Sequence, residues 1–115
     1  MSLRTYVANL EEGRPAIPQA LARLTTELER ARRNRVILLK IIHGYGSSGE
    51  GGAIRQAVQA ELARLERESQ IRTFIPGEDW RVSNEPTWAV LHKYRELKRD
   101  RDLGRGNRGI SIVLL

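Results

Sequence analysis

The chain has 115 residues, no cysteine and a formal net charge of +6, with 20 Lys and Arg residues against 14 Asp and Glu. This length suits one domain over residues 1–115, and the lack of cysteine excludes disulfides, thiolate metal sites and a cysteine nucleophile. No apolar run is long enough to span a membrane and no signal-peptide pattern opens the sequence, so we expect a cytoplasmic protein.

The first part of the chain alternates between strand and helix patterns. Residues 4–10 predict a short strand, and apolar residues at three- and four-residue spacing predict an amphipathic helix over 15–33. Residues 35–43 are almost all apolar, which is typical of a central strand with a parallel neighbour and both faces buried. A second amphipathic helix over 51–68 and a third strand over 70–76 follow.

A longer and less regular connection occupies residues 77–108. It contains a loop with Trp80 and predicts a third helix over 87–104. We expect Trp80 and Trp88 to anchor this connection on the sheet, because tryptophan buries a large area; stacking on unpaired bases is the alternative. Residues 107–115 predict the last strand.

The basic residues are mostly arginine, which accounts for 17 of the 20. The planar guanidinium group pairs with phosphate through two parallel hydrogen bonds and stacks on bases. A basic domain is also attracted to polyanions. The charge therefore favours DNA or RNA as the partner, without distinguishing between them, over the alternative that it only keeps the protein soluble.

Within the third predicted helix the basic residues are interspersed with acidic ones. Glu96 and Arg99 stand three positions apart and are placed to pair on one helix face. The segment is therefore either an arm that follows phosphates or a solvated helix, and both interpretations stay open. His92 belongs to the same helix and is expected on its surface.

The order of these elements predicts an α/β fold. Strand–helix–strand crossovers are right-handed in nearly all proteins, so the first two helices should cover the same face of the sheet. We expect a two-layer sandwich with a four-stranded mixed sheet, two helices on one face and an extra helix in the long connection before the last strand.

A glycine-rich loop follows the buried strand and contains Gly44, Gly46 and Gly49 in the spacing G-x-G-x-x-G. A dinucleotide site would also need an acidic residue at the end of the next strand, and residues 71–76 contain none, so we expect no dinucleotide cofactor. Glycine amides at the start of a helix instead suit a phosphate group. The predicted phosphate-binding residues are Gly44, Gly46, Ser47, Ser48 and Arg55.

His43 ends the buried strand, where ligands of open α/β sheets collect. An imidazole beside a bound phosphate can transfer a proton or hold an oxygen. The alternative is a structural histidine, with glycines that form only a turn. Two histidines far apart and no cysteine argue against a zinc site, whereas carboxylates would suit Mg²⁺, so that ion stays open and no other cofactor is expected.

The stretch "IIHGYGSSGEGGAIRQAVQAEL" resembles the second signature of the small MutS-related (Smr) domain family. In that signature a strand ends in Ile-His-Gly-x-Gly, and the helix after the loop begins with Leu-Arg or Ile-Arg. The flanking helix and strands agree with the family as well. The resemblance implies a fold similar to the C-terminal domain of bacterial translation initiation factor three, nucleic-acid binding, and endonuclease or nicking activity in several members. The matching positions are His43, Gly44, Gly46, Ile54 and Arg55.

Two departures from the family pattern bear on activity. The first family signature, Leu-Asp-x-His-Gly, corresponds here to "VANLEEGRP", which has no histidine and offers Glu11 near the usual aspartate. The segment 77–108 is longer than the family's usual connection. One hypothesis is an endonuclease with His43 and Glu11 as catalytic residues, and the other is a non-catalytic module that binds nucleic acid or protein. Residues expected to contact a nucleic-acid backbone are Arg32, Arg33, Arg35, Lys98 and Arg99.

Overall fold

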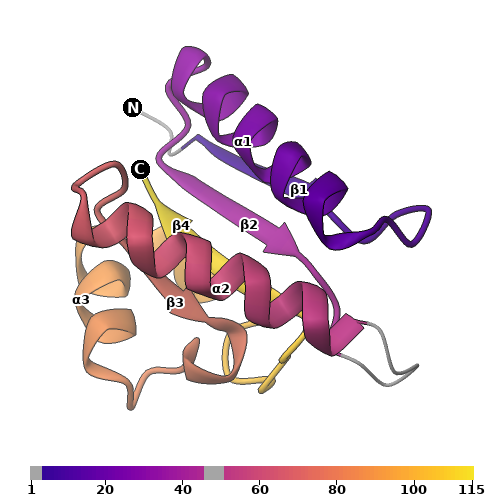
Figure 1. Cartoon of the computed structure of the whole chain (residues 1–115). Coiled ribbons are helices and arrows are strands. Elements are labelled where there is room, and N and C mark those ends of the chain that lie inside the picture. The colour runs from indigo at the N-terminus through magenta and orange to yellow at the C-terminus, as the bar shows by residue number, and fades with distance from the viewer. Residues whose placement is uncertain (1–3, 46–50) are drawn as a thin grey trace.

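The computed structural model of the protein describes residues 4–45 and 51–115 and is built on a four-stranded sheet (Figure 1). None of its described helices is long and apolar enough to cross a membrane. The elements are β1 (Thr5–Asn9), α1 (Ile17–Arg33), β2 (Leu38–Ile42), α2 (Gly51–Arg67), β3 (Thr73–Pro76), the 3-10 helix η1 (Gly77–Asp79), α3 (Glu85–Lys93), the 3-10 helix η2 (Arg95–Arg99) and β4 (Ile110–Leu114).

The strands lie in the order β1-β2-β4-β3. β1 is parallel to β2, whereas β4 runs antiparallel to both of its neighbours, β2 and β3. The sheet is therefore mixed, as expected, and β2 is a central strand. Because β1, β2 and β3 all point the same way, they end at the same end of the sheet, which we call the carboxyl end.

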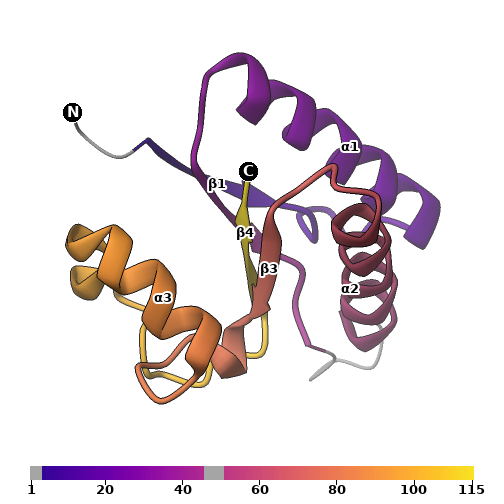
Figure 2. The same cartoon turned by 90° about the vertical axis from the view of Figure 1, so that its left-hand side faces the viewer.

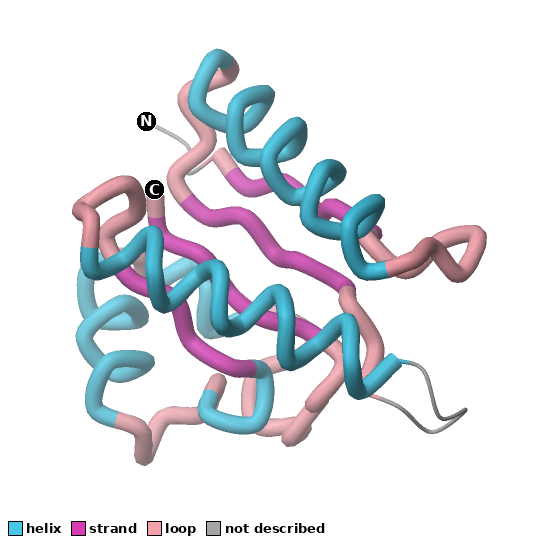
Figure 3. The backbone as a smooth tube through the Cα atoms, viewed as in Figure 1, coloured by secondary structure: helices cyan, strands magenta, loops and turns pink. Residues whose placement is uncertain are grey.

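The helices α1 and α2 cover one face of the sheet (Figures 1 and 3). Leu39 and Ile41 of β2 point into this layer and are completely buried. They share one apolar core with Leu24 of α1 and with Val58 and Leu62 of α2. Each such side chain contributes about 1.5–3 kcal/mol to stability by leaving water. The predicted spacing of both helices and their common face are confirmed.

The long connection covers part of the opposite face, so the two-layer sandwich gains a partial third layer (Figure 2). A second core joins Leu38, Ile110 and Ile112 of the sheet to Leu91 of α3 and to Trp80. Trp80 is 1% exposed, which confirms its expected anchoring role. The sheet is thus buried on both faces along β2 and β4.

The expectation that Trp88 also anchors the connection is wrong, because its side chain is 53% exposed. The first turn of α3 explains this difference. The side-chain oxygen of Asn84 accepts hydrogen bonds from the backbone amide and the hydroxyl of Thr87. This cap turns Thr87 and Leu91 toward the sheet, and the next residue along the helix, Trp88, consequently points outward. There it stacks on His92, which lies on the surface as expected.

The single helix predicted over 87–104 is interrupted. α3 ends at Lys93, and Tyr94 takes a backbone conformation outside the helical region, at φ −124° and ψ 80°. A short 3-10 helix and a series of turns follow instead. Among the described residues, no ion pair joins Glu96 to Arg99, so their expected pairing is also wrong.

The strand predicted over 35–43 begins only at Leu38. Arg35 lies in the left-handed region at φ 55°, and the amide of Val36 still donates to the carbonyl of Ala31 in α1. These residues end the helix and turn the chain, and the strand therefore starts later than its apolar composition indicates.

The cap at Asn84 gives a first testable prediction. Asn84→Ala should lower the free energy of unfolding by about 1 kcal/mol, because the first-turn amide of Thr87 loses its acceptor, whereas the Thr87 hydroxyl keeps the carbonyl of Asp79 at 2.7 Å. Asn84→Asp keeps an acceptor and should retain most of the stability. Urea denaturation of the three proteins measures the difference. Equal losses for both variants would contradict the capping role.

Candidate nucleic-acid interface

A hollow of about 390 Å³ lies at the carboxyl end of β1 and β2. Glu11 lines it from the turn after β1, and Gly44 and Tyr45 line it from the glycine loop after β2. The two turns adjoin, since the amide of Leu10 donates to the carbonyl of Ile42 at 2.8 Å. Among the described residues, the lining is Val7, Glu11, Lys40, Ile42, Gly44, Tyr45, Arg101, Asp102, Asn107, Gly109 and Ile110.

The imidazole of His43 lies on the α2 side of the sheet, is not among the described residues that line this hollow, and is completely buried. Its Nδ1 is 2.7 Å from the carbonyl oxygen of Gly44, and its Nε2 is 2.9 Å from the hydroxyl of Ser111 in β4. A carbonyl oxygen only accepts, so the proton resides on Nδ1 and Nε2 accepts from the Ser111 hydroxyl. Gln59 of α2 donates to the same hydroxyl at 3.4 Å. Both ring nitrogens are therefore engaged in holding the loop.

Burial lowers the pKa of His43 below its ordinary value, because the charged imidazolium loses its hydration. The positive charge of Arg55 acts in the same direction, whereas the Gly44 carbonyl and Glu78 oppose it. The ring is thus kept neutral at physiological pH. This neutral form matches the tautomer that the hydrogen bonds require.

The glycine loop is held by β4. Gly44 lies in the left-handed region at φ 73°, which favours glycine. Its amide and that of His43 both donate to the carbonyl of Gly109, at 3.1 and 2.9 Å. A Cβ on Gly109 would lie 3.2 Å from the side-chain oxygen of Asn107 and 3.4 Å from the ring of Tyr45. Small residues at both positions therefore let the two backbones approach.

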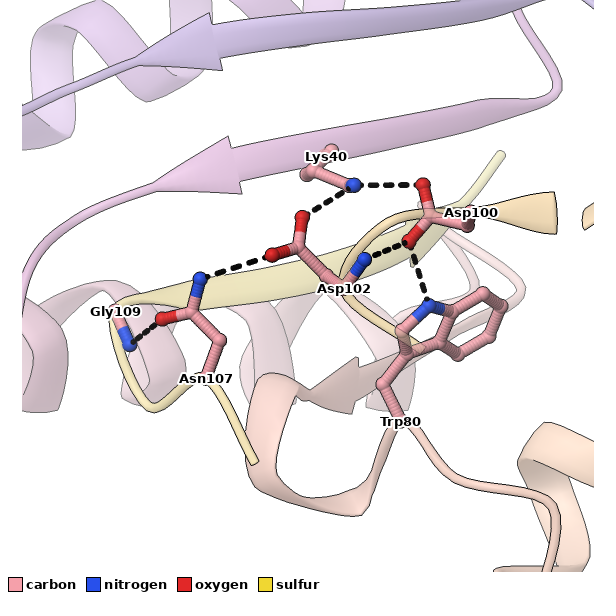
Figure 4. A network of polar contacts seen from close by, with 6 residues as sticks. All are labelled: Lys40, Trp80, Asp100, Asp102, Asn107 and Gly109. Carbon is pink, nitrogen blue, oxygen red and sulfur yellow. Dashed lines mark hydrogen bonds and ion pairs between the residues drawn. The ribbon is translucent and has the colours of Figure 1, made fainter. Parts of the chain in front are cut away.

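Lys40 is a charged residue in the central strand, with only 8% of its surface exposed. Its ammonium group donates to Asp100 at 2.7 Å and to Asp102 at 2.6 Å (Figure 4). The second oxygen of Asp100 accepts from the indole of Trp80 at 3.0 Å. A buried charge is stable only when it is paired in this way. The ion pairs therefore fasten the long connection to the sheet.

The same network continues to Gly109, whose carbonyl holds the glycine loop (Figure 4). The amide of Asn107 donates to Asp102 at 3.1 Å, and its side-chain oxygen accepts from the backbone amide of Gly109 at 2.9 Å. Burial alone would raise the pKa of Asp102, but the hydrogen bonds from Lys40 and Asn107 lower it below its ordinary value. Asp102 thus stays ionised and links Lys40 to the residue that holds the loop.

The sequence interpretation did not identify Lys40, Asp102 or Asn107 as site residues. One signal was available for Lys40, because a single lysine interrupts an otherwise apolar strand. A lysine in such a position requires a buried partner. Its partners are 60 and 62 positions away, and no local pattern identifies them.

Arg55 projects from the second turn of α2 and forms a short ion pair with Glu78 of η1. The two side chains are 24% and 29% exposed. One further nitrogen of Arg55 and one oxygen of Glu78 are buried without a hydrogen-bond partner among the described residues. Glu78 therefore offsets much of the charge that Arg55 brings to this end of the sheet.

The remaining predicted residues lie in several places. Gly46, Ser47 and Ser48 lie outside the described residues. Lys98 and Arg99 belong to η2, on the face opposite α1 and α2, and both are exposed. The other three predicted nucleic-acid contacts lie near the start of β2, at the opposite end of that strand from His43; they are Arg32, Arg33 and Arg35.

Among residues 4–45 and 51–115, no group of three or more His, Cys, Asp or Glu side chains is arranged to hold a metal ion.

Arg32 has a structural contact, since its guanidinium group donates to the carbonyl of Gln70 at 2.7 Å. The structure therefore separates the predicted basic residues into two surfaces. Of these, the η2 surface lies on the same sheet face as the hollow, and its Arg99 lines a second hollow beside the first.

Comparisons with known proteins agree with this architecture. A family model described as the Smr domain matches residues 16–80. The crystal structure of the Smr domain of MutS2 from Thermus thermophilus is similar, with a TM-score of 0.55 and 21% sequence identity over 98% of each chain. A search of curated proteins finds no match. The family match ends at residue 80, so most of the connection that completes the hollow lies outside it.

The buried His43 predicts a pH dependence of stability. Its pKa is lowered in the folded state, so the unfolded chain takes up the proton first as the pH falls below about 6.5. The free energy of unfolding should therefore be highest above that pH and decrease below it, by at most about 1.4 kcal/mol per pH unit for one proton. Urea denaturation between about pH 7.5 and pH 5 measures this slope.

The chain offers a matched control, because it has only two histidines. His43→Gln should flatten the slope, whereas His92→Gln, on the surface, should leave it unchanged. A slope that survives His43→Gln and disappears in His92→Gln would contradict the assignment.

The ion pairs of Lys40 give a prediction of a different kind. Lys40→Met leaves two carboxylates near the sheet without their cation, and should lower the free energy of unfolding by about 3–5 kcal/mol. Adding Asp100→Asn and Asp102→Asn removes the unpaired charges and should recover part of that loss. Thermal and urea denaturation measure both steps. A triple variant that is less stable than Lys40→Met would contradict the electrostatic explanation.

Proposed function

Because the chain belongs to the Smr domain family, we propose that it binds DNA or RNA, with a backbone phosphate held at the carboxyl end of β1 and β2. The family is associated with nucleic-acid binding and nicking. The observation that carries the proposal is that Glu11, from the turn where the first signature is expected, and Gly44, from the second signature, line one hollow. A phosphate in that hollow would meet the start of the glycine loop.

The phosphate contacts would come from backbone and from arginine. Gly44 brings the chain close to the ligand without a side chain, and the proposed contacts of Gly46, Ser47 and Ser48 extend the same loop. Arg101 lines the hollow and is exposed, so its guanidinium group can pair with a phosphate. Arg55 remains a proposed phosphate ligand, although Glu78 offsets its charge.

His43 would then act by holding the glycine loop in place. Its two hydrogen bonds fix the Gly44 carbonyl and join the loop to β4. Loss of the ring would let the loop relax and weaken phosphate binding, even though the ring itself does not line the hollow. His43 is thus a functional residue whose role is to maintain the shape of the loop.

Cleavage of a phosphodiester is the second candidate function, and Glu11 favours it. Its carboxylate is exposed and lines the same hollow as Gly44. A carboxylate beside a bound phosphodiester can accept the proton of an attacking water or hydroxyl group. The alternative remains a module that binds nucleic acid or protein without chemistry, because the histidine of the first signature is missing.

The experiment combines binding with cleavage. Fluorescence anisotropy of labelled single-stranded DNA, single-stranded RNA and duplex DNA should show affinity that falls steeply as salt rises, because phosphate contacts release counterions. The same substrates are then incubated with Mg²⁺ or with a chelator. Weak binding with no salt dependence would contradict the proposed function and favour a protein partner.

The variants separate the two candidate functions. Glu11→Gln should abolish any cleavage while retaining binding, and Glu12→Gln, an adjacent exposed carboxylate outside the hollow, is the matched control. His43→Gln should weaken binding. Binding without product in the unmodified protein would identify a recognition module, and product that survives Glu11→Gln would exclude Glu11 as the base.

A further inference from the structure

The surface of segment 95–108 is positively charged because most of its acidic side chains point inward. Two of its three acidic residues, Asp100 and Asp102, turn toward the sheet, where Lys40 pairs with both and offsets one of their two negative charges. Only Glu96 is left among the exposed residues to offset the basic ones. The exposed basic residues of the segment are Arg95, Lys98, Arg99, Arg101, Arg105 and Arg108.

A groove lies between this segment and β1. The hollow at the carboxyl end adjoins a second one of about 300 Å³, and the two share Val7 and Lys40. Arg101 and Glu11 line the first hollow, and Arg99 and Glu96 line the second. Asp102 and Asp100 also line them, as the partners of Lys40. The groove therefore runs from the glycine loop along the sheet face opposite α1 and α2, with one arginine beside each hollow.

The groove also offers apolar and aromatic surface. Val7 is 54% exposed on its floor, and Tyr45 is 56% exposed at the end beside the glycine loop. Unpaired bases stack on aromatic side chains, whereas a duplex keeps its bases stacked inside and presents mainly phosphates. Arginines beside an apolar floor and an exposed tyrosine fit a single strand better than a duplex.

We propose that this groove binds an unpaired strand of nucleic acid. Arg99 and Arg101 would pair with successive phosphates, and Tyr45 would stack on a base next to the phosphate held at Gly44. The inference rests on the proposed function and adds to it the substrate class, a single-stranded segment. The wall of the groove lies outside the residues that match the Smr family, so this chain's own connection would supply the preference.

The test measures affinity for single-stranded oligonucleotides and for a blunt duplex by fluorescence anisotropy at several salt concentrations. The double variant Arg99→Gln, Arg101→Gln removes two phosphate contacts. At about 0.1 M salt it should bind a single strand roughly 10- to 30-fold more weakly, and the log–log salt slope should fall by about 1.4, since each contact contributes about 0.7. The matched control is Arg67→Gln, Arg72→Gln, which removes the same charge from exposed residues at the other end of the sheet.

Tyr45 provides an independent arm. Tyr45→Leu should weaken single-strand binding about fivefold or more, and Tyr45→Phe should retain it, because the phenyl ring still stacks. Binding to a blunt duplex should change little in either variant. Circular dichroism and thermal denaturation of each variant verify that the fold is intact.

The outcomes distinguish this inference from the proposed function. If the unmodified protein binds no nucleic acid, the proposed function fails and the inference fails with it. If it binds, but the two double variants lose the same affinity or a duplex binds as tightly as a single strand, the function stands and the groove is wrong. A selective loss in the Arg99, Arg101 variant, together with retention by Tyr45→Phe, supports the groove.

Discussion

The position of the long connection, residues 77–108, depends on the buried ammonium group of Lys40. A charge in the central strand of a sheet must find partners, because an unpaired ion loses several kcal/mol of hydration on burial. Asp100 and Asp102 supply those partners from the long connection. Once they do, the connection cannot move away from the sheet, and Trp80 and Leu97 pack beside the ion pairs to complete the second core.

The same constraint shapes the candidate site. Asp102 also accepts from Asn107, and Asn107 accepts from the amide of Gly109. The carbonyl of Gly109 in turn receives two amides of the glycine loop. A chain of polar contacts therefore runs from the middle of β2 to the loop, and the inward acids leave the arginines of the connection facing solvent. The pairing of Asp100 and Asp102 with Lys40 therefore both stabilises the connection and leaves its surface positively charged.

Part of the site was predictable from local patterns. The signature around His43 predicts a loop after a buried strand, and the parallel β1 and β2 bring Glu11 beside Gly44 as the strand order requires. The role of His43 was not predictable, because its environment comes from other elements. Ser111 of β4 contacts the ring, and Gln59 of α2 donates to the hydroxyl of Ser111, whereas a sequence shows only that a histidine is present.

The sequence by itself determined the strand and helix patterns, the burial of β2 on both faces and the family signature, because each depends on residues close together in the chain. Only the tertiary structure decided the partners of Lys40, 60 and 62 positions away, the outward direction of Trp88 and the separation of the arginines onto two surfaces. Periodicity reports which side of one element is buried. It does not report which distant charge a buried charge meets, since that follows from how the elements pack.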